Sequence, residues 1–396
     1  MIIPVYRIRS TLTQVTDRRV TEYIDSVAKE SGHTLTCIDS AAEFAAAPFG
    51  LLYVASGGSE GFFLEEFDNL TKKTVYILTS GESNSLAASM EILSCLHKRG
   101  KKGEILHGSP AYIARRVDSL ARAFRARQAL DGASFGCVGA PSNWLIASTD
   151  DDRYYREKLG LSVVRIPIEE LIDESRKNSW PVNDSVRALE NAGWDRAEME
   201  KALSVYGGLS RIVKKYHLKG VTVRCFDLLE PLGTTGCLAL ALLNEQGIYA
   251  GCEGDVPSLV SMAILGEVSG EPVFMCNPSR IDTDRSEMVL AHCTLPFNMP
   301  KSFTLMTHYE SNIGVALRGK FPLEVCTIFK TDTALDRFHA QRAELLENPE
   351  DPTLCRTQIR LKVTDTNYFL TRPINNHHLI AMGDHTLALN AFFETL

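Results

Sequence analysis

The sequence predicts a mixed α/β protein with two doubly wound, Rossmann-like domains followed by a C-terminal antiparallel β-barrel-like domain. Three observations support this fold class. Short apolar runs alternate with helical patterns over most of the chain, as in parallel sheets covered by helices. From about residue 286 the runs become short, β-rich and separated by turn residues, which is typical of an antiparallel sheet or small barrel. At 396 residues, the chain also exceeds the size at which one hydrophobic core keeps growing.

The first domain is expected over residues 1–132. Its strands include Leu51–Ala55 and Thr74–Leu78, and each runs into a turn rich in glycine or serine before a helix begins. Backbone N–H groups in such turns can hold an anion or sugar hydroxyls. Neither turn has the glycine spacing of a nucleotide-binding fingerprint, so both are interpreted as tight strand–helix connections. A long helix at about 111–130 closes the domain.

The second domain is expected over residues 133–285 and the third over 286–396. The stretch 221–296 holds three apolar runs that we interpret as buried strands of a parallel sheet, namely Val221–Phe226, Ile248–Gly251 and Pro272–Cys276. Four acids and one imidazole stand at or beyond the ends of these strands, where such a sheet binds its ligands; they are Glu253, Asp255, Asp282, Asp284 and His292. Carboxylates gathered with an imidazole indicate a metal-assisted site.

Composition and charge exclude several classes of protein. The net charge is −7, and the short basic run His97–Lys102 is not the concentrated basic face that nucleic-acid binding needs. No apolar run approaches the ~20 residues of a membrane span. Ten cysteines are scattered without a C-x-x-C pair, as for buried thiols in a reducing compartment. Because the opening MIIPVYRIRSTLT reverses the order of a signal peptide, we expect a cytoplasmic protein.

Six short motifs in the second and third domains follow one another in a specific order. They are FGCVGAPSNWLIAS (135–148), TTGCLALALLNEQGI (234–248), CEGDVPS (252–258), NPSRIDTD (277–284), LAHCTLP (290–296) and NNHHLIAMGDH (375–385). Together they resemble the L-fucose/L-arabinose isomerase superfamily, and more narrowly its short fucose isomerase-like members. Over the first domain the resemblance rests on chain order and one SGGSEG turn. It implies a homo-oligomer, a trimer or hexamer, in which a neighbouring N-terminal domain helps to cover the site.

The same resemblance implies an enzyme that interconverts an aldose and a ketose with a divalent metal, usually Mn²⁺, with Mg²⁺ or Co²⁺ as alternatives. By motif, the metal ligands fall on Glu253, Asp282 and His377. Arabinose isomerases have a fourth ligand, which falls on His292. If His292 does not bind the metal, we expect it to bind the sugar.

Moving the carbonyl from C1 to C2 of a sugar requires a proton transfer between two carbon atoms through a cis-enediol. A metal bound to the two adjacent sugar oxygens stabilises the charge of this intermediate. Two carboxylates beside the C1–C2 bond then supply an acid–base pair. Glu253 and Asp282 fit both roles, as ligands and as proton carriers. An oxygen-rich site with one or two imidazoles suits Mn²⁺ or Mg²⁺.

Several of these acids also have an ordinary structural interpretation. Glu253 lies in a glycine-rich loop, where an acid can cap the next helix. Asp255 is better placed for that cap, because Val256-Pro257 begins a helix with proline in its first turn. Asp284 competes with Asp282, and spacing alone does not separate them.

The histidines leave similar alternatives. His377 and His378 are adjacent, so only one of them faces the site if they lie on a strand. The family pattern selects His377, with His378 and His385 as second choices. A histidine after an apolar strand, such as His292, is otherwise a satisfied core residue. Weaker candidates for sugar contacts are Arg280, Trp144, His308, Tyr309 and Glu310.

Three functions therefore remain open from the sequence. The first is a metal-dependent aldose–ketose isomerase that acts on a small sugar. The second is a non-catalytic, cytoplasmic sugar-binding or regulatory protein of the same fold. The third is an isomerase or epimerase of an anionic sugar, either acidic or sulfonated. Because the chain is shorter than typical fucose and arabinose isomerases, the identity of the sugar does not carry over from the resemblance.

Overall fold

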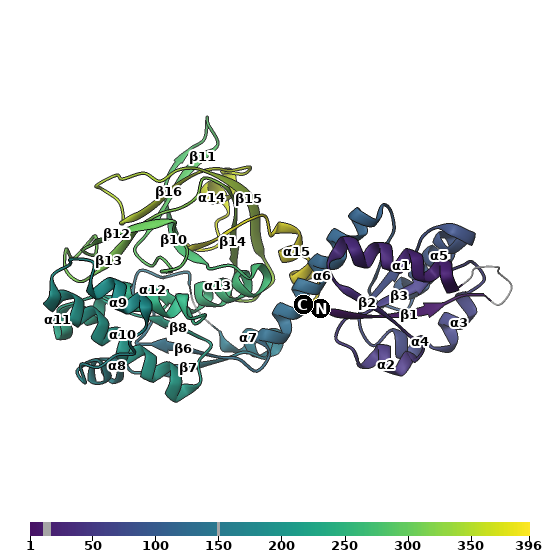
Figure 1. The fold of residues 1–396 in the computed structure, drawn as a ribbon, viewed down its shortest axis with the longest axis horizontal. Helices are drawn as coiled ribbons and strands as arrows, with labels where there is room; N and C mark the ends of the chain where they lie inside the picture. The colour runs from purple at the N-terminus through teal and green to yellow at the C-terminus, as the bar shows by residue number, and fades with distance from the viewer. Residues whose placement is uncertain (11–16, 149–150) are drawn as a thin grey trace. The chain divides into compact units, whose positions relative to one another are not determined.

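A computed structural model of the protein describes residues 1–10, 17–148 and 151–396 (Figure 1). Within these ranges the chain forms two compact units, Met1–Arg125 and Ala126–Glu394, which we call the N-terminal and C-terminal units. None of the helices in the described ranges is both long enough and apolar enough to cross a membrane.

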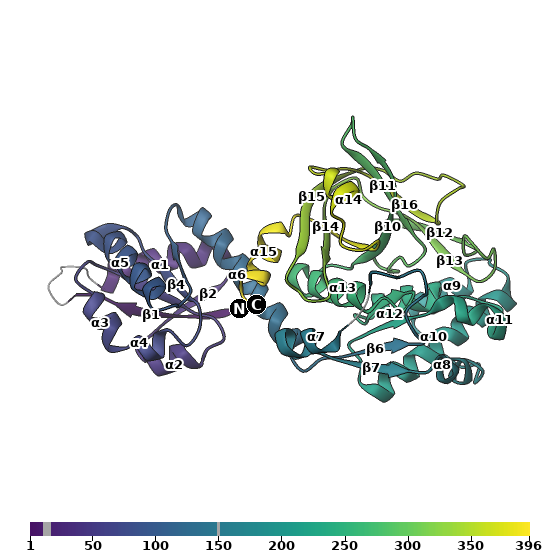
Figure 2. The same cartoon turned by 180° about the vertical axis from the view of Figure 1, so that it is seen from behind.

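The N-terminal unit contains a parallel five-stranded sheet with the strand order β2-β1-β3-β4-β5. Helices lie on both faces of the sheet (Figures 1 and 2), which explains why the interior strands β3 and β4 are apolar throughout. The elements are β1 (Ile2–Ile8), α1 (Asp17–Ser31), β2 (Thr34–Ile38), α2 (Ala41–Ala46), β3 (Leu51–Val54), α3 (Glu60–Glu65), α4 (Phe67–Leu70), β4 (Val75–Leu78), η1 (Glu82–Asn84), α5 (Ser85–Lys98), β5 (Gly103–Leu106) and α6 (Pro110–Leu130). The last residues of α6 already belong to the C-terminal unit.

The C-terminal unit begins with a parallel four-stranded sheet in the order β7-β6-β8-β9. Its elements are β6 (Ser134–Val138), α7 (Asp152–Leu159), β7 (Ser162–Ile166), α8 (Ile168–Ser175), α9 (Asp184–Glu190), α10 (Arg196–Tyr216), β8 (Gly220–Val223), η2 (Cys225–Leu228), α11 (Leu229–Leu232), α12 (Cys237–Glu245), β9 (Tyr249–Cys252) and α13 (Val256–Ser269). The carboxyl ends of β6, β8 and β9 meet at one edge of this sheet.

A closed barrel completes the same unit, with the strand order β10-β11-β16-β15-β14-β17. The elements after α13 are β10 (Phe274–Asp282), β11 (Glu287–His292), β12 (Ser302–Met306), β13 (Ala316–Lys320), β14 (Val325–Thr331), β15 (Phe338–Glu347), β16 (Thr357–Lys362), α14 (Asn367–Thr371), β17 (His378–Met382) and α15 (Thr386–Glu394). Helix α13 contacts β8 and β9 of the parallel sheet and also β14 and β17 of the barrel, so it lies between the two layers (Figure 2).

The sequence predicts that the third apolar run of the stretch 221–296 ends at the edge of the parallel sheet. The structure places this run in the barrel instead. It begins β10, which pairs antiparallel with β11 and β17. The strand continues through a bulge between Pro278 and Arg280 as far as Asp282. Its second half is polar and partly exposed, so the apolar pattern stops before the strand does. The barrel consequently begins before position 286.

The predicted fold class is confirmed as a mixed α/β chain with parallel sheets and a C-terminal closed antiparallel barrel. The Rossmann-like character of the two α/β parts stays a prediction. The segment 133–269, which contains the four-stranded parallel sheet, and the barrel lie within one compact unit.

Candidate active site

The candidate site is built around the loop that follows β9. Glu253 has a backbone φ of 65° and Gly254 one of 69°, in the left-handed region that residues other than glycine rarely adopt. A Cβ at Gly254 would lie 2.5 Å from the carbonyl oxygen of Ala140, so the loop after β6 packs directly against this turn. The backbone N–H of Ser142 donates to the carbonyl oxygen of Glu253 at 2.9 Å. The two loops therefore fix the position of Glu253 together.

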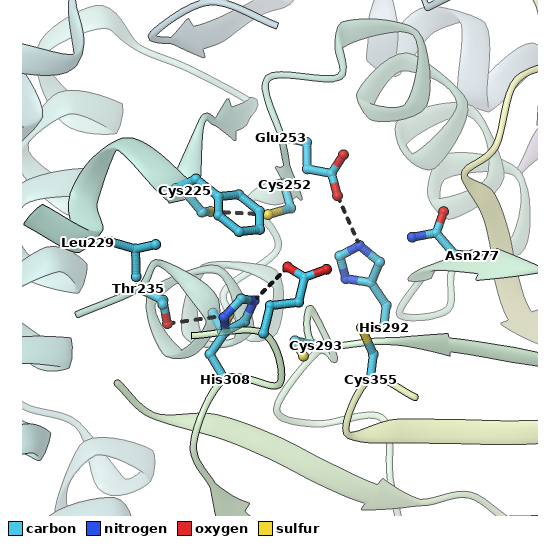
Figure 3. A pocket seen from close by; sticks show the side chains of 13 residues that line it. Cys225, Leu229, Thr235, Cys252, Glu253, Asn277, His292, Cys293, His308 and Cys355 are labelled. Carbon is cyan, nitrogen blue, oxygen red and sulfur yellow. Dashed lines mark hydrogen bonds and ion pairs between the residues drawn. The ribbon is translucent and has the colours of Figure 1, made fainter. Parts of the chain in front are cut away.

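Two histidines of the barrel meet Glu253. Its Oε1 lies 3.5 Å from Nε2 of His377 and 3.9 Å from Nε2 of His292 (Figure 3). One donor atom from each of the three residues lies within 4.8 Å of the other two. His292 is the last residue of β11, and His377 directly precedes β17. The edge of the parallel sheet and two barrel strands thus contribute to one buried cluster.

The Nδ1 atoms of the two histidines have opposite hydrogen-bonding roles. Nδ1 of His377 lies 2.7 Å from Oδ2 of Asp255, and because a carboxylate only accepts, this nitrogen donates. Nδ1 of His292 accepts from the backbone N–H of Thr294 at 3.2 Å and lies 2.8 Å from the hydroxyl of the same residue, which can also donate to it. With Nδ1 as the acceptor, Nε2 carries the hydrogen when that ring is neutral. In its neutral form His377 therefore presents a lone pair to Glu253, whereas His292 presents an N–H.

Asp255 stands behind His377 and is fully buried. It caps α13 as the sequence predicts, accepting from the backbone N–H of Ser258 at 2.9 Å. Burial alone would raise the pKa of Asp255, but the charge of Lys330 and the contacts with His377 and Ser258 lower that pKa to about 2. Burial alone would lower the pKa of His377, but Asp255 and Glu253 raise it to about 9. In the metal-free protein, the two carboxylates therefore favour the protonated form of His377.

Trp144 holds the other oxygen of Glu253. Its Nε1 donates to Oε2 of Glu253 at 2.6 Å, and its ring packs edge-on against Phe226 with 5.2 Å between centroids. Burial alone would raise the pKa of Glu253, but the neighbouring His292 and His377 more than offset this and bring the pKa below its usual range. Trp144 remains 53% exposed, so it also presents an aromatic face at the rim of the site.

A cavity of about 50 Å³ lies beside the cluster (Figure 3). Its polar lining consists of Glu253, Thr235, Asn277, His292, His308 and Glu310, and five cysteines complete the wall together with two apolar side chains. Nε2 of His308 lies 3.9 Å from Oε2 of Glu310. All ten cysteines of the chain are free thiols, and seven of them are buried, in agreement with the prediction of mostly buried thiols without a disulfide framework.

Asp282 and Arg280, both predicted at the site, lie elsewhere. Asp282 is the exposed last residue of β10 and accepts from the backbone N–H of Arg285 at 3.0 Å. It stands five positions after Asn277, which on an extended strand is roughly 17 Å. Arg280 is also exposed and pairs with Asp351 at 2.5 Å. The physical reason is that β10 continues along the barrel instead of ending at the site.

The second choices also lie outside the cluster. His378 faces Tyr368, whose hydroxyl is 3.0 Å from its Nε2, and burial lowers the pKa of His378 to about 3. Nε2 of His385 contacts the carbonyl oxygen of Met382 at 2.6 Å. Asp284 is exposed in the turn between β10 and β11. Of the two adjacent histidines, the structure therefore brings His377 to Glu253.

Asn277 is a polar pocket residue that the sequence interpretation missed. It lines the cavity, and its Oδ1 accepts from the side-chain amide of Asn376 at 3.1 Å, immediately before His377. A signal was present, because Asn277 is the first polar residue after the apolar run 272–276. The prediction was based on carboxylates, so it selected Asp282 and not this neutral amide.

The donor set of the cluster fits a hard divalent cation. Nε2 of His377 is buried and forms no hydrogen bond with any part of the chain that the structure describes, as expected of an atom that binds a ligand. The carboxylate of Asp255 behind this ring is the arrangement that commonly orients a metal-binding histidine. A carboxylate with imidazoles and a nearby amide oxygen suits Mn²⁺ or Mg²⁺ better than a thiolate-preferring metal.

Comparison with known proteins finds a small group of similar proteins that share one name. No protein-family model matches the chain. The chain is similar to sulfoquinovose isomerases. Those of Priestia aryabhattai and Priestia megaterium are each 22% identical to it over 366 residues, covering 85% of this chain and 81% of the relative. A sulfoquinovose isomerase of a Clostridium species is 29% identical over 132 residues, covering 32% of this chain and 30% of that protein.

Proposed function

We propose that this protein is a metal-dependent aldose–ketose isomerase that acts on an anionic, sulfonated sugar through a cis-enediol. The observation that carries the proposal is the convergence of Glu253, His292 and His377 beside one cavity, with their donor atoms within 4.8 Å of one another. The names of the similar proteins support both the isomerase reaction and the sulfonated substrate. The homo-oligomer and the cytoplasmic location stay predictions.

Glu253 and His377 would hold the cation, with the amide oxygen of Asn277 as a further donor on the pocket wall. Neighbouring side chains hold both ligands in position. Trp144 donates to one oxygen of Glu253, and Asp255 accepts from the ring of His377. When bound, a divalent cation supplies Lewis acidity that stabilises negative charge on adjacent sugar oxygens.

His292 is assigned to the substrate rather than to the metal. Its Nδ1 accepts a backbone N–H from Thr294, so the neutral ring directs an N–H, not a lone pair, toward Glu253 and the cavity. An N–H donor at this position stabilises a sugar oxygen as negative charge develops on it. The sequence left open whether His292 binds the metal or the sugar, and the proposal takes the second alternative.

Glu253 is the proton carrier of the proposed reaction. It takes the hydrogen of C2 as a proton and returns it to C1 on the same face of the cis-enediol, so one carboxylate serves both steps. A second proton passes from the oxygen on C2 to the oxygen on C1. His308 and Glu310 line the cavity and are the side chains we assign to this transfer. Asp282, predicted as the second proton carrier, is not part of this proposal.

The test is solvent exchange at C2. Purified protein is stripped of metal, loaded with Mn²⁺ and incubated in D₂O with sulfoquinovose, D-glucose or L-fucose, and the sugars are followed by NMR. We expect deuterium at C2 and a ketose product with the sulfonated sugar, and neither without the metal. Binding of the sugar without exchange would support the non-catalytic function instead. A C2 epimer without ketose would indicate an epimerase.

A further inference from the structure

Lys330 lies on β14 inside the C-terminal unit, and its side chain is completely buried. A buried ammonium is rare and unfavourable unless other groups compensate its charge. Its Nζ donates to Oγ of Ser258 at 2.5 Å, and Ser258 belongs to the first turn of α13. Among the residues that the structure describes, no carboxylate pairs with Lys330 directly. Its charge is therefore compensated through a serine hydroxyl.

Ser258 connects this lysine to the candidate site. Its hydroxyl accepts from Lys330 and donates to Oδ2 of Asp255 at 2.6 Å. The same Oδ2 accepts from Nδ1 of His377 at 2.7 Å. All four residues are fully buried, so water does not compete with these bonds. They form an unbroken series that we call the Lys330 relay, consisting of Lys330, Ser258, Asp255 and His377.

The direction of the hydrogen bonds in the Lys330 relay has a physical consequence. An ammonium group only donates, so the Ser258 hydroxyl accepts from Lys330 and turns its own hydrogen toward Oδ2 of Asp255. The same oxygen accepts from Nδ1 of His377, so the hydroxyl and the imidazole hold the carboxylate from two sides. Loss of either Lys330 or Ser258 would leave the carboxylate free to turn away from the ring.

We propose that Lys330 and Ser258 are positioning residues, which hold Asp255 as the hydrogen-bond acceptor behind the metal-binding histidine. This role rests on the proposed function, because it takes Nε2 of His377 as the atom that binds the cation. Lys330 touches neither the cavity nor the cluster, so it acts only through Asp255. Substitution of Lys330 or Ser258 should therefore change the orientation of His377 before it changes any contact with substrate.

A neighbouring serine provides a matched control. Ser261 is also fully buried on α13, one turn after Ser258. Its hydroxyl donates to the carbonyl oxygen of Pro257 at 2.8 Å and accepts from the backbone N–H of Thr331 at 3.3 Å. It thus links the same helix to the same barrel strand without touching Asp255. Ser258→Ala and Ser261→Ala remove the same atom, but only the first interrupts the Lys330 relay.

The first measurement uses metal-free protein with ¹⁵N-labelled histidine. We expect a downfield Nδ1–H resonance from the bond between His377 and Asp255, identified by its loss in His377→Gln. It should be lost or shifted in Ser258→Ala and Lys330→Met, retained in Ser261→Ala, and restored in Ser258→Thr, which keeps the hydroxyl. An unchanged resonance in both relay variants would overturn the proposed role. If Lys330→Met fails to fold, Ser258→Ala against Ser258→Thr decides the question.

The second measurement is Mn²⁺ binding by calorimetry. We expect Ser258→Ala and Lys330→Met to raise the dissociation constant for Mn²⁺ by about 10–100-fold, as substitutions behind metal ligands typically do. Ser261→Ala should keep this constant within about twofold of the wild-type value. Equal affinity in all variants would refute the role. Failure of the wild-type protein to bind Mn²⁺ would refute the proposed function instead, and the resonance in metal-free protein would still decide whether the Lys330 relay holds His377.

Discussion

Two acidic segments of the chain look alike in sequence and differ completely in the structure. The loop after β9 carries Glu253 and Asp255, and the turn after β10 carries Asp282 and Asp284. The first pair is buried and meets two histidines, whereas the second pair is exposed at a hairpin. The difference teaches that acidity after an apolar run does not make a site. What matters is whether the strand ends where other elements converge.

The largest difference between the two segments is expected in turnover. Glu253→Gln removes the proton carrier while keeping the shape of the side chain, so we expect the rate of C2 exchange to fall by about 10²–10⁴-fold. The rate is measured by NMR in D₂O with saturating Mn²⁺. Thermal unfolding should show that the variant remains folded. Retention of more than a tenth of the wild-type rate would show that another residue carries the proton.

A smaller but still large difference is expected in metal affinity. Asp255→Asn replaces the carboxylate that holds the ring of His377 with an amide, and we expect Mn²⁺ binding to weaken by about 10–100-fold. Calorimetric titration of metal-free protein measures the affinity. Asp282→Asn is the matched control, because it makes the same change in the exposed segment. Equal weakening by both substitutions would contradict the distinction between the segments.

The third difference concerns the stability of the metal-free protein above neutral pH. The pKa of His377 is raised to about 9, above its value of about 6.5 in the unfolded chain. The folded state therefore binds the proton more tightly, and this stability is present below pH 6.5 and lost as the pH rises through 9. We expect urea unfolding to show a loss of up to about 1.4 kcal/mol per pH unit in that window.

Substitution separates the two segments in the same experiment. Asp255→Asn removes one of the two carboxylates that raise the pKa of His377, so its stability should depend less on pH between 6.5 and 9. Asp282→Asn should reproduce the wild-type slope. A slope that is unchanged in Asp255→Asn would show that the charge of Asp255 does not act on His377.

The smallest effect is expected from Asp282 itself. Its carboxylate accepts one backbone hydrogen bond in an exposed turn, and substitutions at such positions usually change stability by no more than about 0.5 kcal/mol. We expect Asp282→Asn to keep turnover and Mn²⁺ affinity within about twofold of wild type. Loss of Mn²⁺ binding in this variant would restore Asp282 as a ligand and would require β10 to end differently in solution.

Much of the architecture could be read from the sequence because its signals are local. Apolar runs followed by helical patterns predicted the parallel sheets, and short β-rich segments predicted the barrel. Glu253, Trp144 and His377 belong to local motifs, and the structure brings all three together. Their roles at the site stay predictions until the metal and the substrate are tested.

The remainder depends on information that local patterns lack. The end of β10 cannot be recognised from the sequence, because the second half of the strand is polar and partly exposed on the barrel. The sequence therefore predicted Asp282 as a site residue instead of Asn277. The burial of Lys330 could not be predicted, because a lysine in the stretch IFKTDT has the pattern of an exposed strand end. Only the three-dimensional packing of β14 on α13 shows that this lysine is buried.

The left-handed backbone at Glu253 places protein stability and the site in opposition. A residue with a side chain costs roughly 1–3 kcal/mol in such a conformation, and glycine would relieve that strain. Glu253→Gly would therefore release backbone strain, but it would also remove the carboxylate that contacts Trp144 and His377. A glutamate that persists here across natural variants would record continuous selection for chemistry against the preference of the backbone.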